Sequence, residues 1–191
     1  MICSALDLAK QSGVCWGEPN GKPEFETWTL GGADTPRGKR GANLMRKLVE
    51  HIAYVKPDLI FIEAPLTAAV LADIGSTQDT TLALQGFVFV AETVAFSRGV
   101  ETRLIERQDA LLHFTGSKKY PRAIKDAAKK ACMARCSQLR WIVADYDQAD
   151  AGALWHYGCA TLNPTAAALA GVEAAVRHSR KTFKPRTRRK R

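Results

Sequence analysis

The sequence has no long hydrophobic run, no Cys-x-x-Cys pair and no leading segment typical of secretion. Its longest wholly apolar stretches, such as residues 59–62 and 87–91, are far shorter than the roughly 20 residues that cross a bilayer, so we predict no membrane-spanning segment. The residues after Met1 lack a basic region followed by an apolar one, which argues against a signal peptide. The five cysteines form an odd set without paired spacing, as expected in a reducing compartment. These absences together predict a cytoplasmic protein.

Most of the chain also carries no net charge, because its acidic and basic residues balance. Residues 1–176 carry 19 basic and 19 acidic side chains, so the formal net charge of +9 comes entirely from residues 177–191. A length of 191 residues with 46% hydrophobic and 25% charged side chains is typical of one folded domain and excludes wholesale disorder. We therefore predict a folded domain at residues 1–176 and a basic, disordered tail at residues 177–191.

The tail has the composition of a segment that binds a polyanion. Nine of its residues are lysine or arginine, and none is acidic. Dense basic charge of this kind neutralises phosphates, and the alternative is a tail that only improves solubility. We predict that the tail contacts nucleic-acid phosphates, through Arg186, Arg188, Arg189, Lys190 and Arg191 among others.

Hydrophobic periodicity predicts three strands, a helix, a strand, a helix, a strand and three helices. Leu44, Leu48 and Ile52 recur at helical spacing, and the helix they define ends before Lys56. A leading hairpin followed by strand–helix alternation indicates an α/β domain with a mixed five-stranded sheet flanked by helices. The expected strands are residues 2–8, 13–17, 24–30, 58–63 and 100–105, and the later helices are residues 80–97, 122–138 and 147–159 and one from Pro164.

Four acidic residues stand apart because they follow apolar segments or begin a helix of small residues. Asp7 ends the first strand, Glu63 ends the apolar strand, and Asp147 and Asp150 lie three positions apart at the start of a helix, where they can share one face. Converging carboxylates repel one another unless cations neutralise them, and their hard oxygen ligands suit Mg²⁺ or Mn²⁺. We therefore predict a two-metal site of the kind that hydrolyses phosphodiesters.

Each carboxylate also has a structural alternative. Asp147 by itself could cap its helix, and Asp7 could accept hydrogen bonds from the turn after the first strand. Glu63 is harder to explain in this way, because the run before it is wholly apolar.

The segments that carry these carboxylates resemble RuvC-type Holliday junction resolvases, and more closely the divergent branch found in phages and prophages. The segments are residues 2–17, 59–65 and 147–154. The last of them begins with the sequence Asp-Gln-Ala-Asp-Ala. The match runs in order over residues 1–160, although only about thirty residues carry it.

The resemblance implies a ribonuclease H-like fold and a nuclease in which Asp7, Glu63, Asp147 and Asp150 are both metal ligands and catalytic residues. Mg²⁺ is the expected cofactor, Mn²⁺ a substitute, and the products carry 5′-phosphate and 3′-hydroxyl ends. A symmetric four-way junction suits two active sites related by a two-fold axis, so a homodimer is expected. The host implied is a bacterial cell or a phage-infected one.

One departure from the family pattern concerns the turn after the first aspartate. Many relatives have glycine there, whereas this chain has Leu8, Ala9 and Lys10. The ATP-binding branch of the same fold needs a glycine-rich turn for phosphates, so no nucleotide cofactor is expected.

Residues 118–140 are strongly basic, with eight lysines and arginines against one acid, Asp126. The family resemblance assigns DNA-backbone binding to this stretch, through Lys118, Lys119, Arg122 and Lys125. The alternative is a solvated helix face.

Two aromatic residues lie near the start of this basic stretch, and a loop follows Glu63. Phe114 and Tyr120 could stack on unpaired bases, although core packing is expected for Phe114. Residues 64–78, which follow Glu63, are expected to form a loop at the rim of the site, where specificity is often determined.

The remaining metal-binding residue types are expected to be structural. Cys132 and Cys136 lie one helical turn apart without a third ligand nearby, so we interpret them as small buried groups. His113 and His156 are also interpreted as structural, with His156 the better candidate for a phosphate or metal contact.

The sequence as a whole predicts a Mg²⁺-dependent endonuclease that acts on four-way or other branched DNA. A less selective nuclease acting on flaps, forks or RNA–DNA hybrids is the alternative within the same class. A non-catalytic junction-binding protein is disfavoured by the complete carboxylate set. A basic nucleic-acid chaperone is disfavoured by the neutral, well-patterned region before the tail.

Overall fold

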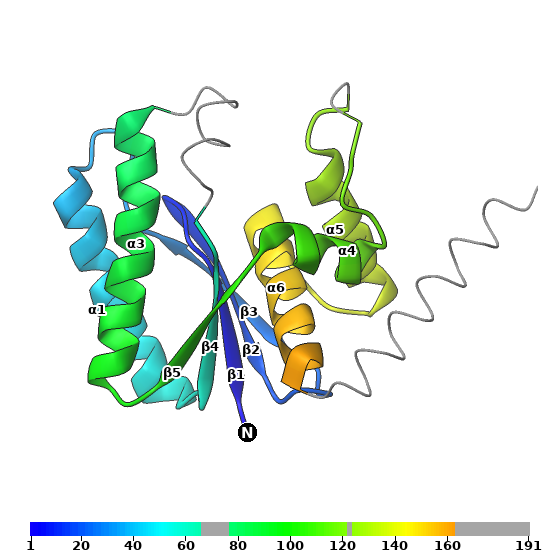
Figure 1. Cartoon of the computed structure of the whole chain (residues 1–191), viewed down its shortest axis with the longest axis horizontal. Helices are drawn as coiled ribbons and strands as arrows, with labels where there is room; N and C mark the ends of the chain where they lie inside the picture. The colour runs from blue at the N-terminus through cyan, green and yellow to red at the C-terminus, as the bar shows by residue number, and fades with distance from the viewer. Residues whose placement is uncertain (66–76, 122–123, 163–191) are drawn as a thin grey trace, which may run out of the picture.

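The structure is a computed structural model that describes residues 1–65, 77–121 and 124–162 (Figure 1). Its centre is a five-stranded sheet in the spatial order β3-β2-β1-β4-β5. The strands β1 (Cys3–Asp7), β2 (Gln11–Gly17) and β3 (Glu24–Thr29) are antiparallel neighbours, whereas β4 (Leu59–Glu63) and β5 (Glu101–Ile105) continue the sheet parallel to β1. The predicted α/β class and mixed five-stranded sheet are confirmed.

Helices cover both faces of the sheet (Figure 1). The helices α1 (Arg37–Val55) and α3 (Gln78–Ser97) form one layer. On the opposite face lies α6 (Tyr146–Leu162), with α4 (Arg107–Thr115) and α5 (Ala127–Gln138) packed beside it.

Side chains of the central strands alternate between these two layers. In β1, Leu6 belongs to the core under α1 and α3, whereas Ala5 belongs to the core under α6. In β4, Ile62 belongs to the first core and Phe61 to the second. Since side chains two positions apart share a face of a sheet, the residues two positions after Ala5 and Phe61 point toward the α6 layer.

The close approach of α6 to the sheet depends on glycine. A Cβ atom at Gly158 would lie 2.5 Å from the ring of Phe61, and one at Gly13 of β2 would lie 1.8 Å from the carbonyl oxygen of Asp147. The indole N–H of Trp155 donates to the carbonyl oxygen of Cys3 at 3.0 Å and anchors the helix on β1. Small residues therefore determine how near the first turn of α6 lies to the sheet.

Length and composition alone would also allow α3 to cross a membrane, since it has 20 residues and a mean hydropathy of 1.3. A core helix of a soluble protein meets the same criteria. Phe87, Ala91 and Ala95 of this helix lie in the core formed with the sheet.

Two regions differ from the sequence prediction. Residues 107–115 form α4, which was not predicted, and Gly116 ends it in the left-handed conformation at φ 79°. The basic helix begins at Ala127 instead of near residue 122. The predicted last helix and the tail lie outside the described residues.

Candidate metal centre

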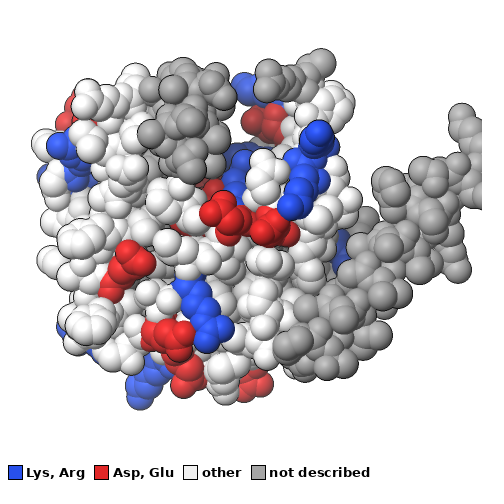
Figure 2. Space-filling view, viewed as in Figure 1, with Lys and Arg blue, Asp and Glu red and all other residues white. Residues whose placement is uncertain are grey.

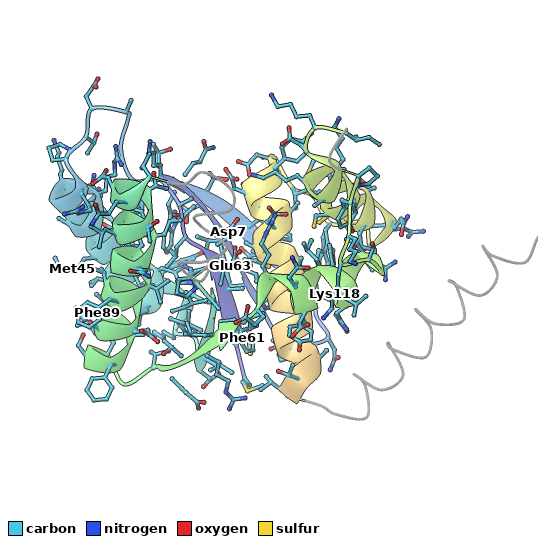
Figure 3. The ribbon with its side chains drawn as sticks, turned by 45° about the horizontal axis from the view of Figure 1, so that its top comes forward. Asp7, Met45, Phe61, Glu63, Phe89 and Lys118 are labelled. Atoms are coloured by element: carbon cyan, nitrogen blue, oxygen red, sulfur yellow. The ribbon has the colours of Figure 1, made fainter. Side chains whose placement is uncertain are left out.

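Two of the predicted carboxylates lie side by side at the carboxyl ends of β1 and β4 (Figure 3). These strands are parallel, and Leu6 pairs with Ile62, so the next residues, Asp7 and Glu63, are neighbours. Both point toward the α6 layer, and a hydrogen bond joins their carboxyl groups. The carboxyl edge of parallel strands is where open α/β sheets usually bind ligands.

The first turn of α6 brings Asp147 and Asp150 to the same edge. The cap of this helix is Asp145, whose Oδ1 accepts from the Gln148 N–H at 2.8 Å and whose Oδ2 accepts from the Thr27 hydroxyl at 2.6 Å. Because Asp145 satisfies the helix terminus, the alternative in which Asp147 caps the helix is wrong.

The turn after β1 is likewise satisfied without Asp7. The Ser12 hydroxyl accepts from the Ala9 N–H at 3.1 Å and donates to the Ala9 carbonyl at 2.8 Å. The structural alternative for Asp7 is therefore also wrong, and its carboxyl group faces Glu63.

Two basic side chains lie among the four carboxylates. Arg107, the first residue of α4, places Nε 3.6 Å from Glu63 Oε1 and Nη2 3.5 Å from Asp150 Oδ2. Lys129 Nζ donates to Asp147 Oδ1 at 3.2 Å. Figure 2 shows acidic and basic side chains side by side across the middle of the face that carries α4. Within the described part of the chain, Arg107 and Lys129 thus set two positive charges against the four negative ones.

These two cations do not fully compensate the carboxylates. Burial, followed by the negative charge of Glu63, raises the pKa of Asp7 well above its ordinary value. Burial also raises the pKa of Glu63, although the hydrogen bond from Asp7 and the charge of Arg107 act in the opposite direction. The pKa of Asp150 is raised by burial against the opposing charges of Arg107 and Lys129. With only these neighbours, Asp7 is the carboxyl group of this cluster whose surroundings favour the protonated form most strongly.

The donor set fits a hard divalent cation. Within residues 1–65, 77–121 and 124–162, no three His, Cys, Asp or Glu side chains are arranged to hold a metal ion as they stand. However, the Asp150 side chain is only 7% exposed, and its Oδ1 has no hydrogen-bond partner in this part of the chain. A buried carboxylate oxygen without a partner is costly, and coordination would satisfy it. The residues therefore fit Mg²⁺ or Mn²⁺ on the condition that Arg107 moves away from Glu63 and Asp150.

The predicted DNA-binding residues lie between α4 and α5 or outside the described part of the chain. Lys118, which lies apart from Asp7 and Glu63 in Figure 3, pairs with Asp109 at 2.6 Å. Lys119 and Lys125 are exposed. Contact of these residues with DNA stays a prediction. Outside the described residues lie Arg122, most of the loop at residues 64–78 and the tail residues Arg186, Arg188, Arg189, Lys190 and Arg191.

The two aromatic residues near the basic segment differ in burial. Phe114 is 2% exposed and stacks on Trp141 with ring centroids 5.7 Å apart, which confirms core packing. Tyr120 is half-buried, and its hydroxyl is hydrogen-bonded to the Thr115 hydroxyl, so stacking of its ring on a base stays a prediction.

The cysteines and histidines behave largely as predicted. Cys132 and Cys136 are fully buried, and burial raises the pKa of the Cys136 thiol to about 12, so both are inert small groups. His156 Nδ1 and His113 Nε2 are hydrogen-bonded at 3.0 Å. Burial lowers the pKa of His156 to about 4, so this pair is neutral and structural near pH 7.

Sequence reasoning missed Arg107 and did not single out Lys129 or Gly13. A signal for Arg107 was present, because it follows the end of a strand parallel to β1 and β4 by two residues and so lies at the same sheet edge. Lys129 carried no distinguishing signal among the basic residues around it. Gly13 pairs with Asp7 across β1 and β2, a relation that only the strand register reveals.

Comparison with known proteins identifies the fold. No family model matches the chain, and no curated protein matches it in sequence. The structure of Thermus thermophilus RuvC matches with a TM-score of 0.61 and 14% identity over 84% of this chain and 95% of that one. The structure of T. thermophilus RuvC in complex with a Holliday junction substrate matches with a TM-score of 0.62 and 12% identity, over 84% of this chain and 94% of that one. The crystal structure of the yeast mitochondrial Holliday junction resolvase Ydc2 matches with a TM-score of 0.56 and 10% identity, over 91% of this chain and 82% of that one. The chain therefore has the ribonuclease H-like fold of the RuvC-type resolvases.

Proposed function

We propose that the chain is a divalent-metal-dependent endonuclease that cleaves four-way or other branched DNA in the cytoplasm of a bacterial or phage-infected cell. The observation that carries the proposal is the convergence of four carboxylates from β1, β4 and α6 at one edge of the sheet. The same fold is found in RuvC and Ydc2, and one of the RuvC structures contains a Holliday junction substrate.

Asp7, Glu63, Asp147 and Asp150 would hold one or two Mg²⁺ ions, with Mn²⁺ as a substitute. Such ions, when bound, activate a water molecule and stabilise the leaving oxygen of a phosphodiester. The chain orients the four carboxylates for such ions, and a bound cation would lower the raised pKa of Asp7. Lys129, hydrogen-bonded to Asp147, limits the repulsion between the carboxylates and the approaching phosphate.

Basic residues outside the carboxylate cluster would hold the DNA backbone. Lys119 and Lys125 are exposed, and Lys118 can exchange Asp109 for a phosphate because both side chains are 44% exposed. Together with Arg122 and the basic tail at residues 177–191, they supply charge that binds phosphates of any sequence. We assign residues 1–176 to the nuclease domain and residues 177–191 to this auxiliary role.

The outer surface of α1 and α3 is the proposed contact between two copies of the chain. A groove of about 450 Å³ lies between these helices, and its lining includes Met45 and Leu82, which are 49% and 46% exposed. Phe89 on α3 is 70% exposed, and Figure 3 shows Met45 and Phe89 on the side of the sheet away from Lys118. A second copy fits this surface, because a symmetric junction requires two active sites and an apolar face suits a self-complementary contact.

Mass measurement in solution tests this contact. Wild-type protein should be a dimer, and the double change of Leu82→Glu and Phe89→Glu should give monomers that remain folded. Ile142→Glu is the matched control, because Ile142 is 82% exposed and lies outside α1 and α3. A monomeric wild-type protein, or a double variant that stays dimeric, would exclude this interface.

Cleavage of labelled four-way, forked and linear DNA, with Mg²⁺ or with chelator, tests the activity. Asp7→Asn should reduce cutting by orders of magnitude and leave junction binding intact, because it removes a proposed ligand but keeps its shape. Asp58→Asn is the control, since Asp58 lies at the opposite end of β4, where its Oδ2 accepts from the Ile2 N–H.

The substrate panel also separates the alternatives. Equal cutting of forks, flaps and RNA–DNA hybrids would indicate the less selective nuclease. Junction binding by wild-type protein without any Mg²⁺-dependent cutting would indicate a non-catalytic binding protein, and the proposed activity would then be wrong.

A further inference from the structure

Arg107 contacts two of the proposed metal ligands loosely. Its distances of 3.6 Å to Glu63 and 3.5 Å to Asp150 exceed the roughly 2.7–3.2 Å of good N–H···O hydrogen bonds. A guanidinium can form two parallel, shorter bonds to one carboxylate, and Arg107 forms neither with these two groups. Its attraction to them is therefore mainly electrostatic, and their lone pairs stay open to a closer partner.

Asp150 provides an independent observation of such an opening. Its side chain is 7% exposed, Arg107 faces its Oδ2, and its Oδ1 has no hydrogen-bond partner among the described residues. The other donor near this carboxyl group is the Cys132 thiol, which is a weak one. Buried polar atoms in folded proteins almost always have a partner. Arg107 thus neutralises Asp150 without satisfying it, which is the expected property of a substitute for another ligand.

The position of Arg107 allows it to leave. Its side chain is 38% exposed, and it stands at the start of α4, at the sheet edge and not in the core. Lys129 differs, because its Nζ donates directly to Asp147 at 3.2 Å and lies 5.9 Å from the centre of the Tyr146 ring. Of these two cations, Arg107 is the one held weakly.

We propose that Arg107 is an exchangeable counter-cation, which holds Glu63 and Asp150 in the metal-free protein and competes with the divalent cation for them. This inference rests on the proposed metal-dependent function. Arg107 keeps the carboxylates close together before the metal arrives, and it lowers metal affinity because it must be displaced.

Metal titration without DNA tests the competition. Free Mn²⁺ is followed by electron paramagnetic resonance while metal-free wild-type, Arg107→Gln and Arg103→Gln proteins are added. Arg103 is the matched control, since it lies on the adjacent β5, pairs with Glu101 at 2.8 Å and changes the net charge equally. Arg107→Gln should bind Mn²⁺ about tenfold more tightly, because a like charge beside the site is removed. Arg103→Gln should differ from wild type by less than about twofold, since exposed charges are screened.

A second measurement uses the wild-type protein, in case Arg107→Gln does not fold. The NMR resonance of the Arg107 Nε–Hε group should shift with metal saturation, whereas that of Arg103 should not. Unchanged or weaker Mn²⁺ binding by folded Arg107→Gln, or an Arg107 resonance that stays fixed while metal binds, would overturn the inference alone. Failure of wild-type protein to bind Mn²⁺ at all would overturn the proposed metal-dependent function as well.

Discussion

Gly13→Ala should disable the candidate site without changing any of its charged groups. A Cβ atom at this position would lie 1.8 Å from the Asp147 carbonyl oxygen and 2.3 Å from its carbon, whereas ordinary contact begins at 3.4 Å. The obstacle is helix backbone and cannot rotate away, so β2 and the first turn of α6 must separate by about 1.6 Å. A displacement of about 1 Å in a catalytic group can reduce the rate by about 100-fold. Forced overpacking should also cost about 1–3 kcal/mol of stability.

The assay measures junction cleavage at saturating protein together with urea unfolding of the same preparations. Gly32→Ala is the control, because a Cβ atom at Gly32 meets nothing within 4 Å. We expect Gly13→Ala to fold, to bind DNA and to cut at least about 100-fold more slowly, while Gly32→Ala resembles wild type. Wild-type cleavage and unfolding by Gly13→Ala would show that β2 and α6 do not approach as closely as described.

Two further predictions concern pH and salt. Burial lowers the pKa of His51 to about 4. Between pH 6.5 and pH 4 the His51 side chain therefore binds a proton in the unfolded chain but not in the folded one. Stability should therefore fall as the pH drops from 6.5 to 4, by up to about 3 kcal/mol from this group, and urea unfolding of His51→Gln should lack this part of the loss. Deletion of residues 177–191 should flatten the dependence of log K for DNA on log salt by roughly 4, if half of its nine basic groups engage at once. Junction preference and cleavage should survive that deletion, and loss of junction preference in a folded truncated protein would show that the tail recognises structure.

The sheet and half of the candidate site could be predicted because their signals are local. The apolar residues of β1 and the apolar run of β4 predict both strands and place Asp7 and Glu63 at their ends. The spacing of Asp147 and Asp150 similarly determines a shared helix face. Each of these inferences needs only the period of one element.

Other features depend on contacts between distant segments and could not be predicted. The large apolar side chains of α4, Leu111 and Phe114, pack with residues of α5 and α6, whereas the small Ala110 lies in the core on the sheet, so the helix lacked the pattern of a sheet-covering helix. The role of Arg107 could not be inferred before the pairing of β5 with β4 was known, because that pairing places Arg107 beside Glu63. The clash that makes Gly13 necessary involves a residue more than a hundred positions away.

The charge balance of the site connects these observations. Four ionised carboxylates with Arg107 and Lys129 leave a formal charge of −2, and proton uptake by Asp7, whose pKa is raised, relieves part of it. One divalent cation would neutralise the site completely. A second would bring the formal charge to +2, which returns to zero when Arg107 withdraws and one negatively charged phosphodiester enters. We therefore expect the second ion to bind more tightly when DNA is present, and Arg107→Gln to reduce this dependence on DNA. Calorimetric Mg²⁺ titration of wild-type protein, with and without a non-cleavable phosphorothioate junction, measures this dependence. The inactive Asp7→Asn variant is unsuitable for the comparison, because it lacks one of the proposed metal ligands. Equal affinity for the second ion with and without that junction would contradict this balance.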